Sequence, residues 1–153
     1  MSSEKILIYG IGNPYRCDDG VGIRAAEEIS RQIADPGITV KWGSIDGVAI
    51  LDEITGYDHV IFIDSVKTEN GKPGDIYRIK PSTDQTTEPF SSHGINFITA
   101  LQFGKKFGLK MPSSIQIFAV EIEDNSTFSE ECTPEVKKSI PEVARAVLKE
   151  IGS

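Results

Sequence analysis

The sequence has few cysteines, and their placement does not suggest a metal or redox centre. Cys17 and Cys132 are the only two, and they lie far apart instead of forming a CxxC pair. Zinc and iron–sulfur sites built on cysteine need several thiolates at close spacing, so such a site is not expected. Two separate free thiols are typical of a protein in a reducing compartment, and we therefore expect a cytoplasmic location.

Long apolar runs and clustered positive charge are also missing. No run approaches the roughly 18 apolar residues needed to cross a bilayer, and the opening MSSEK lacks the features of a secretory signal. The net charge of −7 disfavours nucleic acid as a partner, because phosphates attract basic surfaces. We expect no membrane anchor, no nucleic-acid partner and a monomer with a single domain over residues 1–153.

Apolar runs alternate with amphipathic stretches along the chain. A continuous apolar run predicts a strand buried on both faces, whereas apolar residues spaced three and four apart predict a helix. The strands are predicted over residues 5–11, 38–45, 59–65, 75–81 and 114–120, and the helices over about 19–33, 48–56, 94–108 and from an N-cap at Thr133 onward.

This order predicts an α/β fold of three layers, doubly wound, in which helices cover both faces of a mostly parallel five-stranded sheet. The connection over 68–75 is too short for a helical crossover. Strand 75–81 should therefore return antiparallel, as a hairpin, at an edge of the sheet. Pro141 lacks an N–H and is predicted to kink or restart the last helix.

Acidic residues gather where the predicted parallel strands end, and ligands in such folds bind beyond those carboxyl ends. His93 precedes the third predicted helix and could reach the same edge. The acidic residues that follow or end these strands are Asp18, Asp19, Asp46, Asp64, Glu121, Glu123 and Asp124.

Most of these residues also have a structural interpretation. Asp18 or Asp19 could cap the first helix, Asp46 could cap the second, and His93 could be a solvated loop residue. Asp64 differs because it ends an apolar central strand, where an ionised carboxylate is costly unless it is paired or liganded. The sequence alone leaves these alternatives open.

Taken together, carboxylates and an imidazole at one edge suit a divalent transition metal such as Zn²⁺ or Ni²⁺. The same groups could polarise a water or a carbonyl. His59, which precedes a strand, is predicted to be structural. Cys17 is a poor nucleophile, because the neighbouring aspartates disfavour the thiolate.

The stretch GIGNPYRCDDGVG, residues 10–22, opens like a phosphate-binding loop but does not fit one. Gly10 and Gly12 match the GxGxxG pattern, but Tyr15 stands where the third glycine belongs. The two aspartates would repel a pyrophosphate. No GKS, GxSxG or HExxH motif occurs either, so we expect no nucleotide. The two glycines are predicted instead to let the chain turn sharply off the first strand.

These motifs resemble the maturation endopeptidases of nickel–iron hydrogenases. Residues 10–22 match that family's GxGNxxxxD(D/E)GxG signature at every defined position. DHVIFIDS is similar to the strand that ends in the family's second acidic residue, and SSHG to the segment that carries its histidine. EIED and TPEV resemble its last strand and the start of its final helix, so order and spacing agree over nearly the whole chain.

The resemblance implies a peptidase that removes a C-terminal extension from the large-subunit precursor of a nickel–iron hydrogenase after nickel has been inserted. It places the metal-contacting and catalytic residues on Asp19, Asp64 and His93. The nickel would belong to the immature large subunit and would not be a resident cofactor. Asp18 is expected to support the turn, and Asp46 matches a further acidic position.

Two loops depart from the family pattern. DGVAIL replaces a glycine-rich loop after the second strand, and Glu131-Cys132 replaces a Gly-Leu pair before the final helix. Both loops bear on recognition of the precursor. The alternatives are a non-catalytic nickel-binding chaperone on the same scaffold and a Rossmann-like nucleotide-binding module.

Overall fold

The computed structural model describes residues 4–45, 49–81 and 97–152. Asp46 and His93 lie outside these ranges. No helix within them is long and apolar enough to cross a membrane. The elements are β1 (Ile6–Ile11), the 3₁₀ helix η1 (Cys17–Gly20), α1 (Val21–Ser30), β2 (Ile38–Gly43), α2 (Ala49–Ile54), β3 (His59–Val66), β4 (Ile76–Ile79), α3 (Phe97–Lys106), β5 (Ser114–Glu121) and α4 (Pro134–Gly152).

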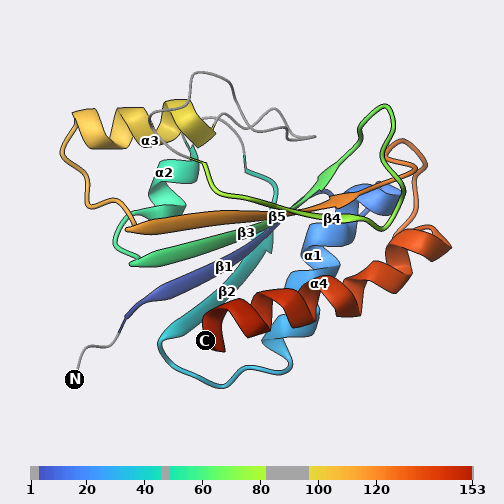
Figure 1. The fold of residues 1–153 in the computed structure, drawn as a ribbon, viewed down its shortest axis with the longest axis horizontal. Helices are drawn as coiled ribbons and strands as arrows, with labels where there is room; N and C mark the ends of the chain where they lie inside the picture. The colour runs from blue at the N-terminus through green and yellow to red at the C-terminus, as the bar shows by residue number, and fades with distance from the viewer. Residues whose placement is uncertain (1–3, 46–48, 82–96, 153) are drawn as a thin grey trace.

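The five strands form one sheet in the order β2-β1-β3-β5-β4 (Figure 1). β1 pairs in parallel with β2 and β3, and β3 pairs in parallel with β5. Only the edge strand β4 runs antiparallel. The prediction of a mostly parallel five-stranded sheet with one antiparallel edge strand is therefore confirmed.

The predicted hairpin between β3 and β4 is wrong, because β4 pairs with β5 instead. β5 lies between them and is buried along its length from Gln116 to Glu121, whereas β4 is only half-buried and exposes Arg78. The more apolar strand takes the central position beside β3, where both faces are covered. The chain therefore crosses the end of the sheet before β4 begins, and β4 is left at the edge.

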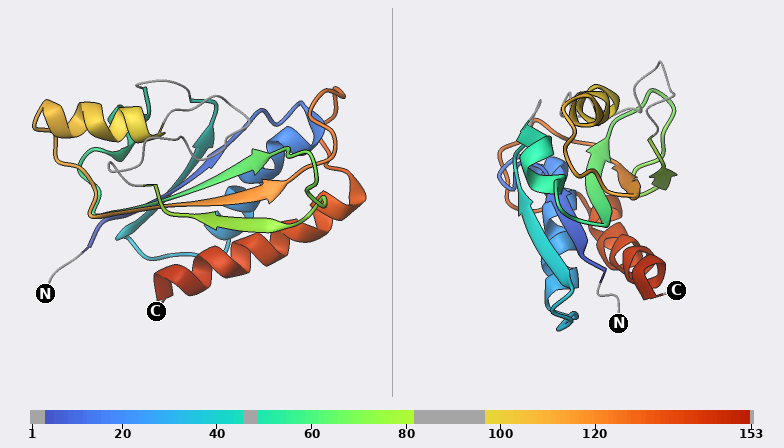
Figure 2. Two further views of the ribbon diagram at one scale, coloured as in Figure 1. Left: turned by 45° about the horizontal axis from the view of Figure 1, so that its top comes forward. Right: turned by 90° about the vertical axis from the view of Figure 1, so that its left-hand side faces the viewer.

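Helices cover both faces of the sheet, as predicted (Figure 2). α1 and α4 pack on one face, and α2 and α3 pack on the other. Side chains of β3 alternate between the two layers: Ile61 and Ile63 join the core under α1 and α4, while Val60 and Phe62 join the core under α2 and α3. A strand buried on both faces accounts for the unbroken apolar run in the sequence.

The glycines of residues 10–22 let α1 lie directly on the sheet. A Cβ added at Gly22 would stand 2.3 Å from the carbonyl oxygen of Ile63, and one at Gly10 would stand 2.3 Å from the carbonyl oxygen of Gly22. Neither Gly10 nor Gly12 has a positive φ. Gly10 lies within β1, and Gly12 lies at a bend directly after that strand. Both positions also need glycine because each brings two backbones into close approach.

The last helix starts where the sequence predicted, with Thr133 before it and Pro134 as its first residue. It continues as one helix through Pro141 to Gly152, so of the two predicted outcomes, a kink or a restart, the restart is wrong. The buried side chains on either side of this proline pack under the sheet as one continuous stripe. Tertiary packing of that stripe outweighs the hydrogen bond that the proline removes.

Candidate active site at the carboxyl edge of the sheet

Asp64 lies near the end of the central strand β3 and is almost completely buried, with 1% of its surface exposed. It stands in register with Ala119 of β5. Because side chains alternate along a strand, Asp64 shares the face of Val60 and Phe62, which is the face that α2 and α3 cover. Its Oδ1 accepts a hydrogen bond of 2.7 Å from the backbone N–H of Ser65.

Asp19 lies in η1, just beyond the end of β1, and is also buried. Its Oδ2 accepts a hydrogen bond of 2.9 Å from the backbone N–H of Asn13. Its Oδ1 lies 3.4 Å from the hydroxyl of Ser65, which donates to it. The N-cap of α1 is Gly20, so Asp19 does not cap that helix.

Ser65 therefore joins the two candidate acids, and sequence reasoning missed it. Its N–H binds Asp64 and its hydroxyl binds Asp19. Ser65 is fully buried and lies on the opposite face of β3 from Asp64. The signal in the sequence is a second polar residue, directly after Asp64, at the end of an apolar strand.

Asp18 serves the fold instead. It has no exposed surface, and its Oδ2 accepts hydrogen bonds from the N–H groups of Glu123 (3.1 Å) and Asp124 (3.0 Å). Its Oδ1 accepts one of 2.7 Å from the N–H of Thr133. This carboxylate thus ties η1 to the loop after β5 and to the start of α4, a wider structural role than support of its own turn.

The two thiols flank this tie and are poor nucleophiles. Burial, and then the nearby Asp18 carboxylate, raise the pKa of Cys17 above its ordinary value. The same two causes raise the pKa of Cys132 to about 12. A thiol with so high a pKa stays protonated near neutral pH, and the thiolate is the reactive form. The expectation that Cys17 is no nucleophile agrees with this environment.

Glu121 is a third buried acid at this edge, and it holds the connection between β3 and β4. Its Oε2 accepts a 2.7 Å hydrogen bond from the N–H of Thr68, and its Oε1 accepts bonds from the Thr68 hydroxyl (2.7 Å) and the Tyr77 hydroxyl (2.9 Å). A Cβ added at Gly71 would stand 1.8 Å from Oε1. Glu121 is thus engaged on both oxygens by the segment that wraps over it.

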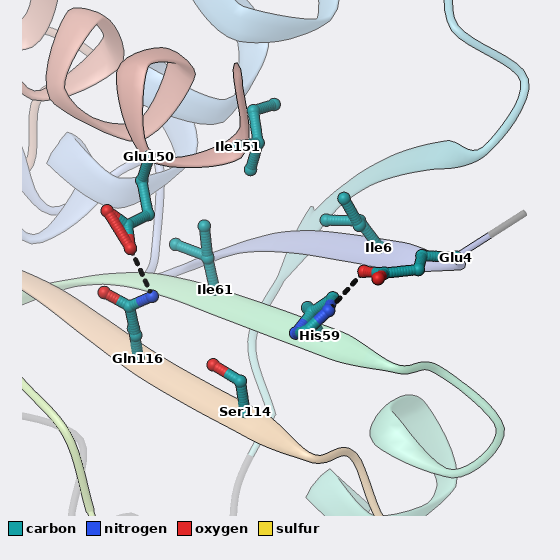
Figure 3. Close-up of a pocket in the computed structure, with 8 residues that line it drawn as sticks. All are labelled: Glu4, Ile6, His59, Ile61, Ser114, Gln116, Glu150 and Ile151. Atoms are coloured by element: carbon teal, nitrogen blue, oxygen red, sulfur yellow. Dashed lines mark hydrogen bonds and ion pairs between the residues drawn. The ribbon is translucent and has the colours of Figure 1, made fainter. Parts of the chain in front are cut away.

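The two histidines of the sequence fall in different places. His59 begins β3 at the amino end of the sheet and pairs through Nε2 with Glu4. Figure 3 shows this pair in a pocket that also holds the hydrogen bond from Gln116 to Glu150. His59 is therefore remote from the carboxyl edge, as predicted. His93 lies outside the described residues, four positions before α3 begins.

The described part of the chain thus links two of the three predicted site residues, Asp19 and Asp64, through Ser65. Within that part, no three His, Cys, Asp or Glu side chains are grouped so that they could hold a metal ion. Two buried carboxylates in fixed orientations can accept a proton from a water or contribute oxygen ligands to a divalent cation. A metal bound here would need further donors.

Comparison with known proteins identifies the family. The sequence model of the hydrogenase maturation protease family matches residues 23–150, a span that starts just after the opening motif. The chain is 26% identical to the hydrogenase 2 maturation protease of Escherichia coli K12, over 70% of this chain and 69% of that protein. It is 24% identical to the hydrogenase expression/formation protein HupD of Thiocapsa roseopersicina, over 91% of this chain and 64% of that protein.

Solved structures agree on the fold. The hydrogenase maturating endopeptidase HybD from E. coli superimposes with a TM-score of 0.81 at 22% identity, covering 96% of this chain and 91% of that one. The nickel–iron hydrogenase maturation protease HycI from Thermococcus kodakarensis superimposes with a TM-score of 0.75 at 20% identity, covering 97% and 93%. The family expected from the motifs is confirmed. The chain belongs to the hydrogenase maturation protease family, and is thus a peptidase.

Proposed function

We propose that this peptidase removes the C-terminal extension of a nickel–iron hydrogenase large-subunit precursor after nickel has been inserted. Asp19, Asp64 and His93 contact the nickel, which arrives with the precursor as part of the substrate. Carboxylate oxygens and an imidazole nitrogen suit Ni²⁺ as ligands. A protease that must touch the metal can cut only a precursor that has received it.

The main support for this proposal is the link through Ser65. Asp19 comes from η1 and Asp64 from β3, yet one serine holds both carboxylates at the same edge of the sheet. Buried carboxylates that fixed donors already orient need little rearrangement when a ligand binds, so little binding energy is spent on it. The resemblance assigns the role of the third donor to His93.

The chemistry requires one proton acceptor and one polarising group. A water oxygen adds to the scissile carbonyl carbon while a carboxylate, of Asp19 or Asp64, takes the proton of the water. The carbon–nitrogen bond then breaks, and the leaving nitrogen takes up a proton. The remaining groups hold the carbonyl and the metal in fixed positions. This orientation of the reacting atoms lowers the activation barrier.

The test is incubation of the nickel-loaded precursor with the purified protein, followed by intact-mass spectrometry. We expect the wild-type protein to shorten the precursor, and Asp19→Asn, Asp64→Asn and His93→Ala to leave it intact while keeping the wild-type circular dichroism spectrum. Glu123→Gln is the control, because Glu123 is an exposed acid at the same edge whose backbone, not its carboxylate, contacts Asp18. Full-rate cleavage by all three variants would refute the assignment, and an intact precursor with wild-type protein would favour the chaperone alternative.

A further inference from the structure

Two large aromatic side chains are exposed next to the candidate site. Tyr15 follows β1 and is 51% exposed, and Phe128 follows β5 and is 86% exposed. Their rings are stacked, with centroids 6.3 Å apart and planes inclined by 14°. Two adjacent exposed rings indicate a binding surface, because burying their apolar area against a partner would be favourable. We call Tyr15 and Phe128 the aromatic pair.

The loops that carry the aromatic pair are held rigidly together. The N–H of Ser129 donates to the carbonyl of Tyr15 (2.9 Å), and the N–H of Cys17 donates to the carbonyl of Ser129 (2.8 Å). Arg24 of α1 donates to the carbonyl of Glu130 (3.1 Å). The two loops lie side by side in Figure 2, beyond the carboxyl edge. The backbone positions that carry the two rings are therefore held side by side before a partner arrives.

The same turn carries the aromatic pair and the candidate site. Asn13 donates its N–H to the carboxylate of Asp19, while its side-chain Oδ1 accepts a 2.9 Å bond from the N–H of Tyr15. One asparagine thus fixes a candidate active-site acid and the backbone that carries one ring of the pair. A substrate chain that binds the rings therefore contacts a residue only four positions before Asp19 in the sequence.

The surroundings of Phe128 are acidic. Residues 121–131 contain five carboxylates and no lysine or arginine. Glu121 is buried and engaged, but Glu123, Glu130 and Glu131 are exposed. Basic groups nearby include exposed Arg16, half-buried Arg24, which reaches toward Glu27, and Lys137, whose Nζ lies 3.8 Å from Glu131. The loop that carries Phe128 remains negative, which favours a partner with basic side chains.

We propose that the aromatic pair is the docking surface for a segment of the precursor that presents an apolar side chain flanked by lysine or arginine. This rests on the proposed function and adds the specificity element for the same site. The apolar side chain lies on the rings, and the flanking cations face the exposed carboxylates of Glu130 and Glu131. Docking on the aromatic pair selects the precursor that reaches Asp19. It does not change the rate of the chemical step.

The experiment compares steady-state cleavage of the nickel-loaded precursor by wild-type protein and the double variant Tyr15→Ser/Phe128→Ser. We expect KM to rise ~10-fold or more, since removing buried ring area costs about that much, while kcat and the melting temperature stay unchanged. Phe107→Ser is the matched control, because Phe107 is 60% exposed but lies beyond the far end of α3.

The acidic part of the surface is tested by salt. The KM of the wild-type protein should rise with sodium chloride, because salt screens the attraction between charges. Glu130→Gln/Glu131→Gln should make KM depend less on salt.

Binding of the precursor, measured by interferometry without reference to cleavage, separates this inference from the proposed function. A wild-type protein that binds but does not cut would refute the proposed function and still test docking through the Kd of the double variant. A double variant with KM and Kd within twofold of wild type would overturn the docking surface alone. Failure of the wild-type protein to bind any precursor would overturn both.

Discussion

The carboxylate of Asp18 accepts hydrogen bonds from both the backbone N–H and the hydroxyl of Thr133, a residue 115 positions away in the chain. The neighbouring Asp19 instead faces Ser65 and Asn13. Two adjacent aspartates therefore have separate tasks. Asp18 closes the fold by tying three segments together, whereas Asp19 lies at the carboxyl edge of the sheet, held by Asn13 and Ser65.

This division predicts that Asp18→Ala destabilises the protein far more than Asp19→Asn. Removing the Asp18 carboxylate leaves the N–H groups of Glu123, Asp124 and Thr133 without their acceptor in a buried site. We expect a loss of about 3 kcal/mol in the free energy of unfolding for Asp18→Ala. Asp19→Asn keeps an acceptor of the same shape and should lose less than about 1 kcal/mol. Guanidinium denaturation of both variants checks this, and equal losses would contradict the division of roles.

Cys132 makes stability depend on alkaline pH. Its pKa is raised from an ordinary value of 9.0 to about 12 in the folded protein, so the folded state holds the thiol proton more tightly than the unfolded state does. The resulting stabilisation is fully present below pH 9 and is lost as pH rises through 12. The difference in melting temperature between wild type and Cys132→Ala should therefore change across this window. A constant difference from pH 8 to pH 11 would argue against a raised pKa.

Gly22 is predicted to tolerate no side chain. A Cβ there would lie 2.3 Å from the carbonyl oxygen of Ile63 and 2.7 Å from that of Ile11, so α1 would have to move off the sheet. Gly22→Ala should cost about 2–3 kcal/mol in the free energy of unfolding. Gly152→Ala is the matched control, because nothing lies within 4 Å of that position, and it should change stability by less than about 0.5 kcal/mol. Urea denaturation of both variants makes the comparison.

The strands, their order of appearance and the position of Asp64 could be predicted from the sequence because each depends on local pattern. An apolar run marks a buried strand, and an acid at its end marks the carboxyl edge. The pairing of β4 could not be predicted in this way, since it depends on β5, which follows some 35 residues later in the chain. Local pattern does not indicate whether β4 or β5 lies beside β3 in the sheet.

The division between Asp18 and Asp19 was beyond local pattern for the same reason. It depends on where residues 123–133 return in space, and nothing near the two aspartates encodes that. The resemblance to a known family assigned Asp19 to the site, and the hydrogen bonds of Asp18 explain why its neighbour is not equivalent. The close approach of Gly10 and Gly22 to neighbouring backbone was also beyond local pattern, because it is a tertiary property.

Ser65 gives the sharpest test of the candidate site that does not alter an acid. Its hydroxyl donates to Asp19 and its N–H binds Asp64, so Ser65→Ala removes one link and keeps the other. We expect kcat for precursor cleavage to fall ~10-fold, because one carboxylate loses a neutral donor that orients it, while KM stays within twofold. Ser139→Ala is the control: Ser139 is equally buried, but its hydroxyl donates to the carbonyl of Val136 in α4. If Ser65→Ala gave the same kcat as wild type and Ser139→Ala, the hydroxyl link between the two acids would have no part in catalysis, and Asp19 would have to be oriented by other contacts, such as that with Asn13.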